Sequence, residues 1–346
     1  MRLKIQGGSV LMQRLHNIQQ GVALISILLV VVIATVLGVA MVRDQNITIQ
    51  RTRNFFNQSQ AKQYALGGEE LSRQILWEDF ERGENRDTLQ EAWAQSDFLF
   101  EFEDGEVQIQ IEDLQGRLNV NGLRMEGPGN RQTRMRFTNL FAQLGIDQVY
   151  VDRIADWIDA DINVRQLGAE DFEYLALEIP YRTSGQMIVD VSELRLLLDL
   201  DRDTYERMLP YVTALPDETL TLNINTAPAI VLQSISSGLG IDAAEGLVRT
   251  RDDQLGFQSV TEFLQSPDVA GLGISGEGLG VQSAFFEIRV RARYRQRFAY
   301  LTSIVQRDTI DGSMRVIYRN SGVKISPVVD NSGVESEVGP VGKSGV

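Results

Sequence analysis

The chain of 346 residues contains no cysteine and a single histidine, His16. The lack of cysteine excludes disulfides, thiolate nucleophiles and thiolate zinc sites. The lack of any histidine after residue 16 excludes a Ser-His-Asp arrangement from the rest of the chain. The sequence offers no pair of carboxylates that can be nominated as the two facing acids of a glycosidase. These absences favour a protein that is not an enzyme.

Basic residues are also scarce, with 33 Lys and Arg against 47 Asp and Glu and a formal net charge of −14. Residues 1–21 contain Arg2, Lys4 and Arg14 and no acidic residue, so the remainder has 30 basic against 47 acidic residues, or −17. A body this acidic repels phosphate backbones and anionic headgroups. We therefore expect no nucleic acid partner, and calcium is the favoured small ligand.

Charged residues are absent from one long stretch near the N-terminus, residues 22–42, which read VALISILLVVVIATVLGVAMV. Twenty-one such residues are long enough to cross a bilayer as one helix. The preceding basic residues place the leader in the cytoplasm and the body on the other side of the membrane. An ordinary signal anchor or signal peptide also fits this hydropathy. However, helical spacing of apolar residues continues to Ile75, which indicates one long helix, half in lipid and half outside.

The start of this stretch carries a family resemblance. Gly21 followed by Val22-Ala23-Leu24-Ile25 resembles a type IV pilin-like signal. The resemblance implies that a prepilin peptidase cuts between Gly21 and Val22 and methylates the new amino group of Val22. Most proteins of this group carry Glu at the fifth residue after the cleavage point, where it pairs with a neighbouring subunit's terminal ammonium. In this sequence the fifth residue, counted from Val22, is Ser26. Ser26 is therefore suited to the end of a fibre, and this omission resembles the K-type minor pseudopilins of the type II secretion system.

A sheet is predicted on both sides of a long middle region. An Asp104-Gly105 turn lies between two alternating segments, which indicates a hairpin. The predicted strands are residues 98–103, 106–111, 285–294, 297–306 and 314–319. They suggest an α+β fold in which one antiparallel sheet packs on the outer half of the long helix and is interrupted by a large insertion.

The insertion reads as mainly α-helical and contains an internal repeat. Leu118-Asn119-Val120-Asn121 and Leu222-Asn223-Ile224-Asn225 each precede a helix, a glycine-containing turn and a second helix. Both fit a helix-hairpin-helix plan, and the second, with Gly238-Leu239-Gly240, is close to modules in which helix N–H groups hold a DNA phosphate. A membrane-anchored helix-hairpin-helix DNA-binding receptor is therefore the alternative function. Asp242 and Glu245 oppose it, because they lie where a phosphate contact favours Lys or Arg.

An acidic stretch between the two copies is the candidate metal site. Asp159, Asp161 and Asn163 alternate as oxygen ligands do in calcium loops, and Glu170 and Asp171 could close the site from the other side. It is not an EF-hand, because no glycine follows Asn163. A solvated acidic loop is the alternative interpretation. This stretch also resembles the middle of K-type minor pseudopilins, and that resemblance implies calcium.

The expected organisation is a cleavable leader at residues 1–21, a transmembrane segment at 22–42, a periplasmic helix with the first strands at 43–114, the inserted helical domain at 115–280, C-terminal strands at 281–320 and a disordered tail at 321–346. The resemblance implies a tip complex with the I-type and J-type minor pseudopilins, which initiates or caps the fibre of major pseudopilin and supports protein export across the outer membrane. It also implies a single-pass protein of the bacterial inner membrane, surrounded by lipid before assembly, with its C-terminal body in the periplasm.

Overall fold

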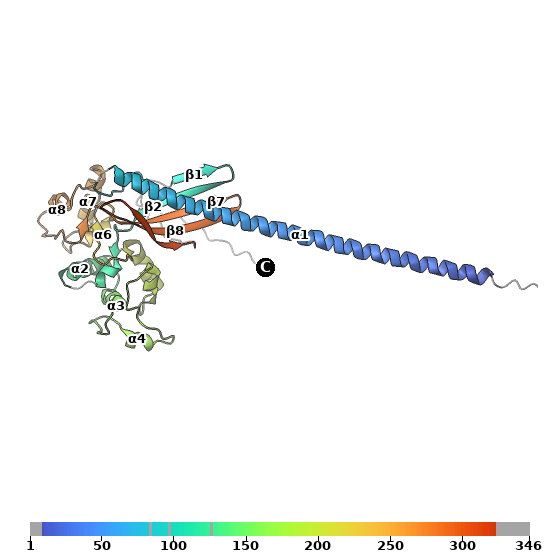
Figure 1. The fold of residues 1–346 in the computed structure, drawn as a ribbon. Coiled ribbons are helices and arrows are strands. Elements are labelled where there is room, and N and C mark those ends of the chain that lie inside the picture. The colour runs from blue at the N-terminus through green and yellow to red at the C-terminus, as the bar shows by residue number, and fades with distance from the viewer. Residues whose placement is uncertain (1–8, 83–84, 96–97, 125–126, 323–346) are drawn as a thin grey trace, which may run out of the picture.

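The computed structural model describes residues 9–82, 85–95, 98–124 and 127–322, and it describes side chains from residue 24 onward except that of residue 128. Residues 1–8 of the predicted leader and 323–346 of the predicted tail lie outside the described residues. The described chain forms one long helix, a sheet packed against the far end of that helix, and a helical body beyond it (Figure 1).

Helix α1, Ser9–Glu81, runs for 73 residues. In the described residues it is the one helix long and apolar enough to cross a membrane, with a mean hydropathy of 3.0 over its most apolar window, none of which is buried. Its last turns contact the sheet through Ala61, Ala65 and Leu76, which are almost fully buried and share one face because they are spaced by multiples of about 3.6 residues. The α1 carboxylate of Glu69 also pairs with Arg319 on the edge strand at 2.6 Å.

The sheet has five antiparallel strands in the order β1-β2-β7-β8-β9. They are β1 Phe98–Phe102, β2 Gly105–Asp113, β7 Phe285–Tyr294, β8 Arg297–Arg307 and β9 Met314–Asn320. The face toward α1 carries alternate apolar residues such as Val107, Ile109 and Val290, which form a core with the end of α1. The predicted antiparallel sheet on the outer half of a long helix is therefore confirmed.

The hairpin turn differs by one residue from its prediction. Phe102 pairs with Gly105, so the turn residues are Glu103 and Asp104 rather than Asp104 and Gly105. Gly105 is the first residue of β2, and a Cβ there would overlap with the backbone carbonyl of Arg293 on β7. This glycine therefore permits the close approach of a neighbouring strand and is not the residue that makes the turn.

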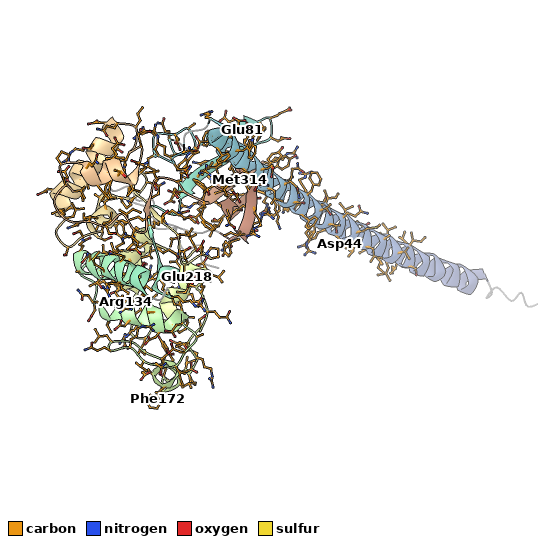
Figure 2. The ribbon with its side chains drawn as sticks, turned by 60° about the vertical axis from the view of Figure 1, so that its left-hand side comes forward. Asp44, Glu81, Arg134, Phe172, Glu218 and Met314 are labelled. Carbon is orange, nitrogen blue, oxygen red and sulfur yellow. The ribbon has the colours of Figure 1, made fainter. Side chains whose placement is uncertain are left out.

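The residues between β2 and β7 form the helical body, which has a hydrophobic core of its own. Arg134, Phe172 and Glu218 lie in this body, apart from Asp44 on α1 (Figure 2). Its elements are β3 Leu118–Asn119, η1 Val120–Arg124, α2 Pro128–Gln143, α3 Val149–Ile158, α4 Asp171–Leu175, η2 Val191–Leu196, α5 Arg202–Met208, η3 Leu209–Tyr211, β4 Val212–Thr213, β5 Leu222–Asn223, α6 Ala229–Gln233, α7 Ile241–Asp253, α8 Val260–Gln265 and β6 Leu279–Gly280. The body is mainly helical, as the sequence predicted.

The two Leu-Asn-x-Asn motifs adopt the same local structure. Each opens with a two-residue strand in a parallel pair, β3 with β4 and β5 with β6. In each motif the first asparagine accepts the N–H of the second, and the second is fully buried. The Asn121 carboxamide pairs with the backbone N–H and C=O of Ile188, and that of Asn225 does the same with Phe257. The helices that follow differ, since α2 has 16 residues and α6 has 5, so the feature common to both copies is the strand with its asparagine pair.

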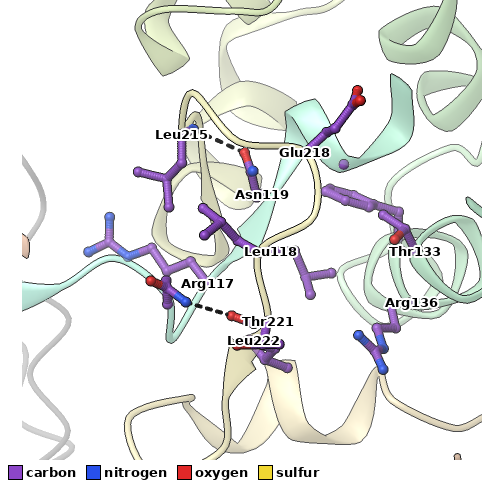
Figure 3. Close-up of a pocket in the computed structure, with 13 residues that line it drawn as sticks. Arg117, Leu118, Asn119, Thr133, Arg136, Leu215, Glu218, Thr221 and Leu222 are labelled. Atoms are coloured by element: carbon purple, nitrogen blue, oxygen red, sulfur yellow. Dashed lines mark hydrogen bonds between the residues drawn. The ribbon is translucent and has the colours of Figure 1, made fainter. Parts of the chain in front are cut away.

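A small cavity of about 40 Å³ lies beside the first motif, between β3, α2 and the segment that leads to β5 (Figure 3). Gln115 Nε2 donates to the carbonyl of Thr221 at 2.9 Å, and the N–H of Leu215 donates to Asn119 Oδ1 at 3.0 Å. A cavity of this size has room for ordered water. It is too small to be a ligand site.

A buried polar network joins the helical body to the sheet. Asp113, at the end of β2, accepts hydrogen bonds from Asn223 at 3.1 Å, Thr226 at 2.5 Å and Ser283 at 2.7 Å. Burial raises the pKa of Asp113 to about 6, although these hydrogen bonds oppose the rise. Beside it, Arg307 of β8 contacts both carboxylate oxygens of buried Asp87, at 2.5 and 2.6 Å.

Candidate metal centre

Helix α3 carries two acids of the candidate centre at its C-terminal end. Asp156 lies in the last turn of α3 and is 0% exposed, and Asp159 is the residue that caps the helix and is 9% exposed. The apolar stripe of α3 faces the core, which places these acids beneath the following loop. Negative charge at the C-terminal end of a helix is unfavourable because the helix dipole is negative there. Two buried acids at this end therefore need a cation nearby.

The loop after α3 folds back over these acids. The N–H of Arg165 donates to Asp156 Oδ2 at 3.1 Å, and the N–H of Leu167 donates to Asp152 Oδ2 at 3.1 Å. The loop comes so near that a Cβ on Gly168 would overlap with the Asp156 carboxylate. The Arg165 guanidinium contacts Asp156 Oδ1 at 2.5 Å and also bonds to Asp159 Oδ2.

Glu170 completes the group from the start of α4. It is 3% exposed, and one oxygen from each of Asp156, Asp159 and Glu170 lies within 4.8 Å of the others. Burial, together with the negative charges of Asp156 and Asp159, raises the pKa of Glu170 to about 7. Burial likewise raises the pKa of Asp156, against the effect of its hydrogen bonds with Arg165.

Two oxygens of this group have no hydrogen-bond partner. Asp159 Oδ1 and Glu170 Oε1 are both buried, and neither accepts a hydrogen bond. A buried carboxylate oxygen without a partner is costly, and a bound cation would remove that cost. Calcium lies 2.3 to 2.6 Å from its oxygen ligands, so a pair of ligand oxygens up to about 5 Å apart can share one ion. The three acids fit such an ion in both donor type and separation.

The structure brings together only part of the predicted ligand set. Asp159 and Glu170 belong to the group, together with Asp156, which the sequence analysis did not nominate. Asp161 and Asn163 are exposed, and Asp161 Oδ1 accepts the N–H of Asn163 at 2.7 Å, as in a solvated turn. Asp171 pairs with Arg182 at 2.7 Å and accepts the N–H of Thr183 at 3.0 Å. These three residues lie on the rim of the centre.

A second acidic group, Asp79, Asp87 and Glu91, lies between the end of α1 and the sheet. Arg307 is 4% exposed and lies within ion-pair distance of Asp79 and Asp87, at 4.0 and 2.5 Å. Glu91 accepts hydrogen bonds from Trp93 Nε1 at 2.6 Å and from the Thr88 N–H at 3.1 Å. An arginine already supplies the positive charge here, so this group is a buried ion pair that ties α1 to β8.

The proposed phosphate contact of the second repeat lies at the start of α7. Gly240 caps this helix with a φ of −72°, and Asp242 and Glu245 in its first turns are exposed. Glu245 lies 3.7 Å from Arg249, and the guanidinium of buried Arg251 donates to the carbonyl of Ala227 at 2.7 Å. The helix therefore presents acidic side chains where a phosphate would approach.

The predicted processing and assembly residues all lie in α1. Gly21 and Val22 are within its helical backbone, although their side chains are outside the described part, and Ser26 is exposed. The cleavage between Gly21 and Val22, the methylation of Val22 and the role of Ser26 stay predictions.

Family models described as type II secretion system protein K match residues 116–217 and 222–282. The type II secretion system protein K of Pseudomonas aeruginosa is 37% identical over 327 residues, which covers 91% of this chain and 96% of that one. The protein of the same name from Klebsiella pneumoniae is 33% identical, with 82% of this chain and 92% of that one covered. The chain belongs to the type II secretion system protein K family.

Membership of this family makes the chain a minor pseudopilin of the type II secretion system, as the pilin-like signal and Ser26 indicated. No comparison supports the DNA-binding alternative. The fold agrees with that of the crystal structure of the GspK-GspI-GspJ complex from enterotoxigenic Escherichia coli. The TM-score is 0.70 at 24% identity, and the match covers 79% of this chain and 100% of that one.

Proposed function

We propose that this minor pseudopilin is a tip subunit of the pseudopilus, that it acts by assembly and not by catalysis, and that it joins the I-type and J-type minor pseudopilins. The observation that carries this proposal is the position of the helical body, which lies beyond the end of α1 and projects to one side of it (Figure 1). In a fibre of parallel α1 helices, the next subunit outward would need that space. The body therefore suits the outermost position and would block further growth there.

The α1 helix supports the same role. Its apolar residues from Leu24 to Val42 are exposed along the whole length of the stretch. Such a surface is stable only in lipid or against other apolar helices. Before assembly the stretch would lie in the inner membrane, with the body in the periplasm, and afterwards it would pack beside the α1 helices of the partners and of the major pseudopilin fibre. Ser26 lacks the carboxylate with which a subunit receives a neighbour's terminal ammonium.

Co-purification tests the tip assignment. The full-length chain, expressed with the I-type and J-type proteins of its own system and extracted in mild detergent, should elute with both in one complex. A variant with Leu28 and Val32 replaced by Trp should lose both partners, because the larger side chains hold neighbouring helices away from the exposed apolar face of α1. Elution of the native chain alone, from a membrane extract that contains both partners, would argue against a tip complex.

We also propose processing by a prepilin peptidase between Gly21 and Val22, with methylation of the new amino group. The mature protein should then begin at Val22 and carry one extra methyl group, which intact mass and N-terminal peptide mass spectrometry would detect. A Gly21→Leu variant should remain uncut. A native protein that retains residues 1–21 would refute this processing.

Calcium is the proposed ligand of the metal centre. Asp156, Asp159 and Glu170 would hold the ion, with the rim residues Asp161, Asn163 and Asp171 near it. The support lies in the two unpartnered oxygens of Asp159 and Glu170 and in the spacing of the three acids. A bound ion would neutralise buried charge at the end of α3 and hold the loop and α4 against the body.

Thermal unfolding with calcium and with a chelator tests this ligand. Binding at a hundredfold excess over the dissociation constant stabilises a protein by about 2.7 kcal/mol, so the melting temperature should rise with calcium. Glu170→Gln should abolish most of this rise, whereas Asp171→Asn, on the rim, should retain it. Equal melting temperatures of the native protein with calcium and with chelator would remove the site.

The two predicted helix-hairpin-helix copies would serve as scaffold. Acidic residues at the start of α7 and the net charge of −14 favour this role over DNA binding. The protein should therefore fail to shift duplex DNA in a gel assay at moderate salt.

A further inference from the structure

We propose that Arg165 is an internal counter-ion of the metal centre, which occupies the acidic group when no metal is bound and is displaced when a divalent cation enters. This inference rests on the cation site proposed above. It concerns the regulation of that site by a residue of the chain itself.

The position of the guanidinium supports this role. A single nitrogen, Nη1, contacts both Asp156 Oδ1 and Asp159 Oδ2, so Arg165 is shared between two of the three acids that would hold the ion. The third acid, Glu170, has no ion pair among the described residues, and its Oε1 is without a partner. One positive charge therefore serves three carboxylates and satisfies only part of their oxygens.

The backbone and the side chain of Arg165 have separate anchors. Its N–H donates to Asp156 Oδ2, and its carbonyl accepts the N–H of Gly168 at 3.1 Å, so two backbone contacts hold the loop in addition to the guanidinium. The Arg165 side chain is 33% exposed, whereas that of Asp156 is 0% exposed. The guanidinium thus lies on the solvent side of the acids. It can turn outward into water without disturbing the core around α3.

Simple electrostatics makes the two cations compete. Like charges a few ångströms apart repel strongly at the edge of a protein, so a divalent ion between Asp156 and Asp159 and a guanidinium on the same two carboxylates disfavour each other. The oxygens Asp156 Oδ1 and Asp159 Oδ2 that Arg165 occupies become ligands only after it leaves. In the metal-free protein, Arg165 stabilises the loop. When calcium is present, Arg165 competes with it and lowers the affinity of the site for calcium. The site therefore fills at higher calcium concentrations than it would without Arg165.

Calorimetric titration of the full-length protein with calcium chloride, in mild detergent, tests the proposal. Arg165→Gln removes the charge and keeps a polar, although shorter, side chain. Calcium should bind this variant at least about tenfold more tightly, and its metal-free form should melt at a lower temperature than the native protein. Arg165→Lys retains one charge but not the planar fork, so its affinity should lie between the two.

Arg182→Gln is the matched control. Arg182 lies in the same region and pairs with Asp171 on the rim, but its side chain is 73% exposed and contacts neither Asp156 nor Asp159. Calcium affinity should change less than about twofold in this variant. Arg182→Gln therefore separates the loss of a nearby positive charge from the loss of the counter-ion itself.

The outcomes are distinguishable. Calcium binding by Arg165→Gln that is unchanged or weaker than in the native protein would overturn the proposal and make Arg165 a residue that positions the ligands. Binding by the variant alone would support it in its strongest form. An absence of binding in both proteins would refute the cation site and this inference together. If Arg165→Gln does not fold, Arg165→Lys with native or weaker affinity overturns the proposal.

Discussion

The contact of α1 with the sheet passes through Gly68, and the neighbouring Gly67 provides a matched control within the same helix turn. Gly68 is buried, and a Cβ at this position would lie 2.6 Å from Val290 Cγ1 and 2.9 Å from Val107 Cγ1. Gly67 is exposed, and a Cβ there would have nothing within 4 Å. An alanine at each position therefore has the same helix propensity but a different environment.

The two effects can be set against each other. Alanine is favoured over glycine inside a helix by about 1 kcal/mol. Overpacking a well-packed core costs about 1 to 3 kcal/mol, and here both valines belong to strands that cannot easily move. We expect Gly67→Ala to raise the free energy of unfolding by about 0.5 to 1 kcal/mol. Gly68→Ala should lower it by about 0 to 2 kcal/mol, which is the overpacking cost less the gain in helix propensity.

Urea unfolding of the full-length protein in mild detergent measures both variants. Tryptophan fluorescence is a suitable probe, because buried Trp93 packs edge-on against Phe286 in the same core, with ring centroids 5.3 Å apart. If Gly68→Ala proved as stable as Gly67→Ala, the helix would not lie as close to the sheet as the structure places it. Our account of how α1 is seated would then be wrong.

Three further predictions follow from buried groups, each measured by the same unfolding assay. Asn225→Ala should lower the free energy of unfolding by about 2 to 4 kcal/mol, because it leaves the N–H and C=O of Phe257 buried and unpaired. Asn121→Ala, in the equivalent position, should lower it by a similar amount, and losses below about 1 kcal/mol would contradict the shared role. Arg307→Met should lower the free energy of unfolding by about 3 to 5 kcal/mol by leaving Asp87 buried without its partner, and adding Asp87→Asn should restore part of that loss. If the losses of the two single variants simply add in the double variant, the two groups do not interact. Burial, with the charges of Asp79 and Asp87, raises the pKa of Glu91 to about 7, so between about pH 4.5 and pH 7 the folded state holds a proton that the unfolded state has released. The contribution of this group to the free energy of unfolding therefore falls as the pH rises from about 4.5 to 7. Glu91→Gln should reduce this fall by about 1 kcal/mol once solvent screening is allowed for, and an unchanged pH profile would refute the assignment.

The sheet and the long helix could be predicted because their signals are local and repetitive. Apolar and charged residues alternate over 286–294, and 297–306 is rich in apolar and β-branched residues, so both segments could be recognised as strands, and the structure ends them at Tyr294 and Arg307. The predicted turn lies one residue too far along the chain, because an Asp-Gly pair fits both a turn and a strand whose glycine allows a neighbouring strand to come close. The pairing of Gly105 with Phe102 on β1 and with Tyr294 on β7 distinguishes the two.

The metal centre was only partly predictable, for a related reason. Asp159 and Glu170 could be nominated from an acidic loop, but Asp156 lies within the apolar run of α3 and resembles an ordinary helical residue. Its signal is the spacing: Asp152 and Asp156 are four residues apart on the face that the apolar residues bury. Arg165 could not be assigned, because the return of the loop onto α3 depends on tertiary contacts that the sequence does not display.

The position of the insertion explains how a large body can be attached to a small sheet without distorting it. Strands β2 and β7 are antiparallel neighbours, and their register ends with Asp113 opposite Phe286. The two ends of the insertion therefore leave adjacent interior strands at the same end of the sheet, side by side, which is the geometry that tolerates an inserted domain. Asp113 then accepts hydrogen bonds from Asn223 of the second repeat and from Ser283 just before β7, so one buried carboxylate joins the end of β2 to the inside of the body and to the segment that leads back to the sheet. A body held at two adjacent points and by one buried polar network is oriented rigidly on the sheet, and a rigid orientation is what a subunit needs if its body is to obstruct the next position in a fibre.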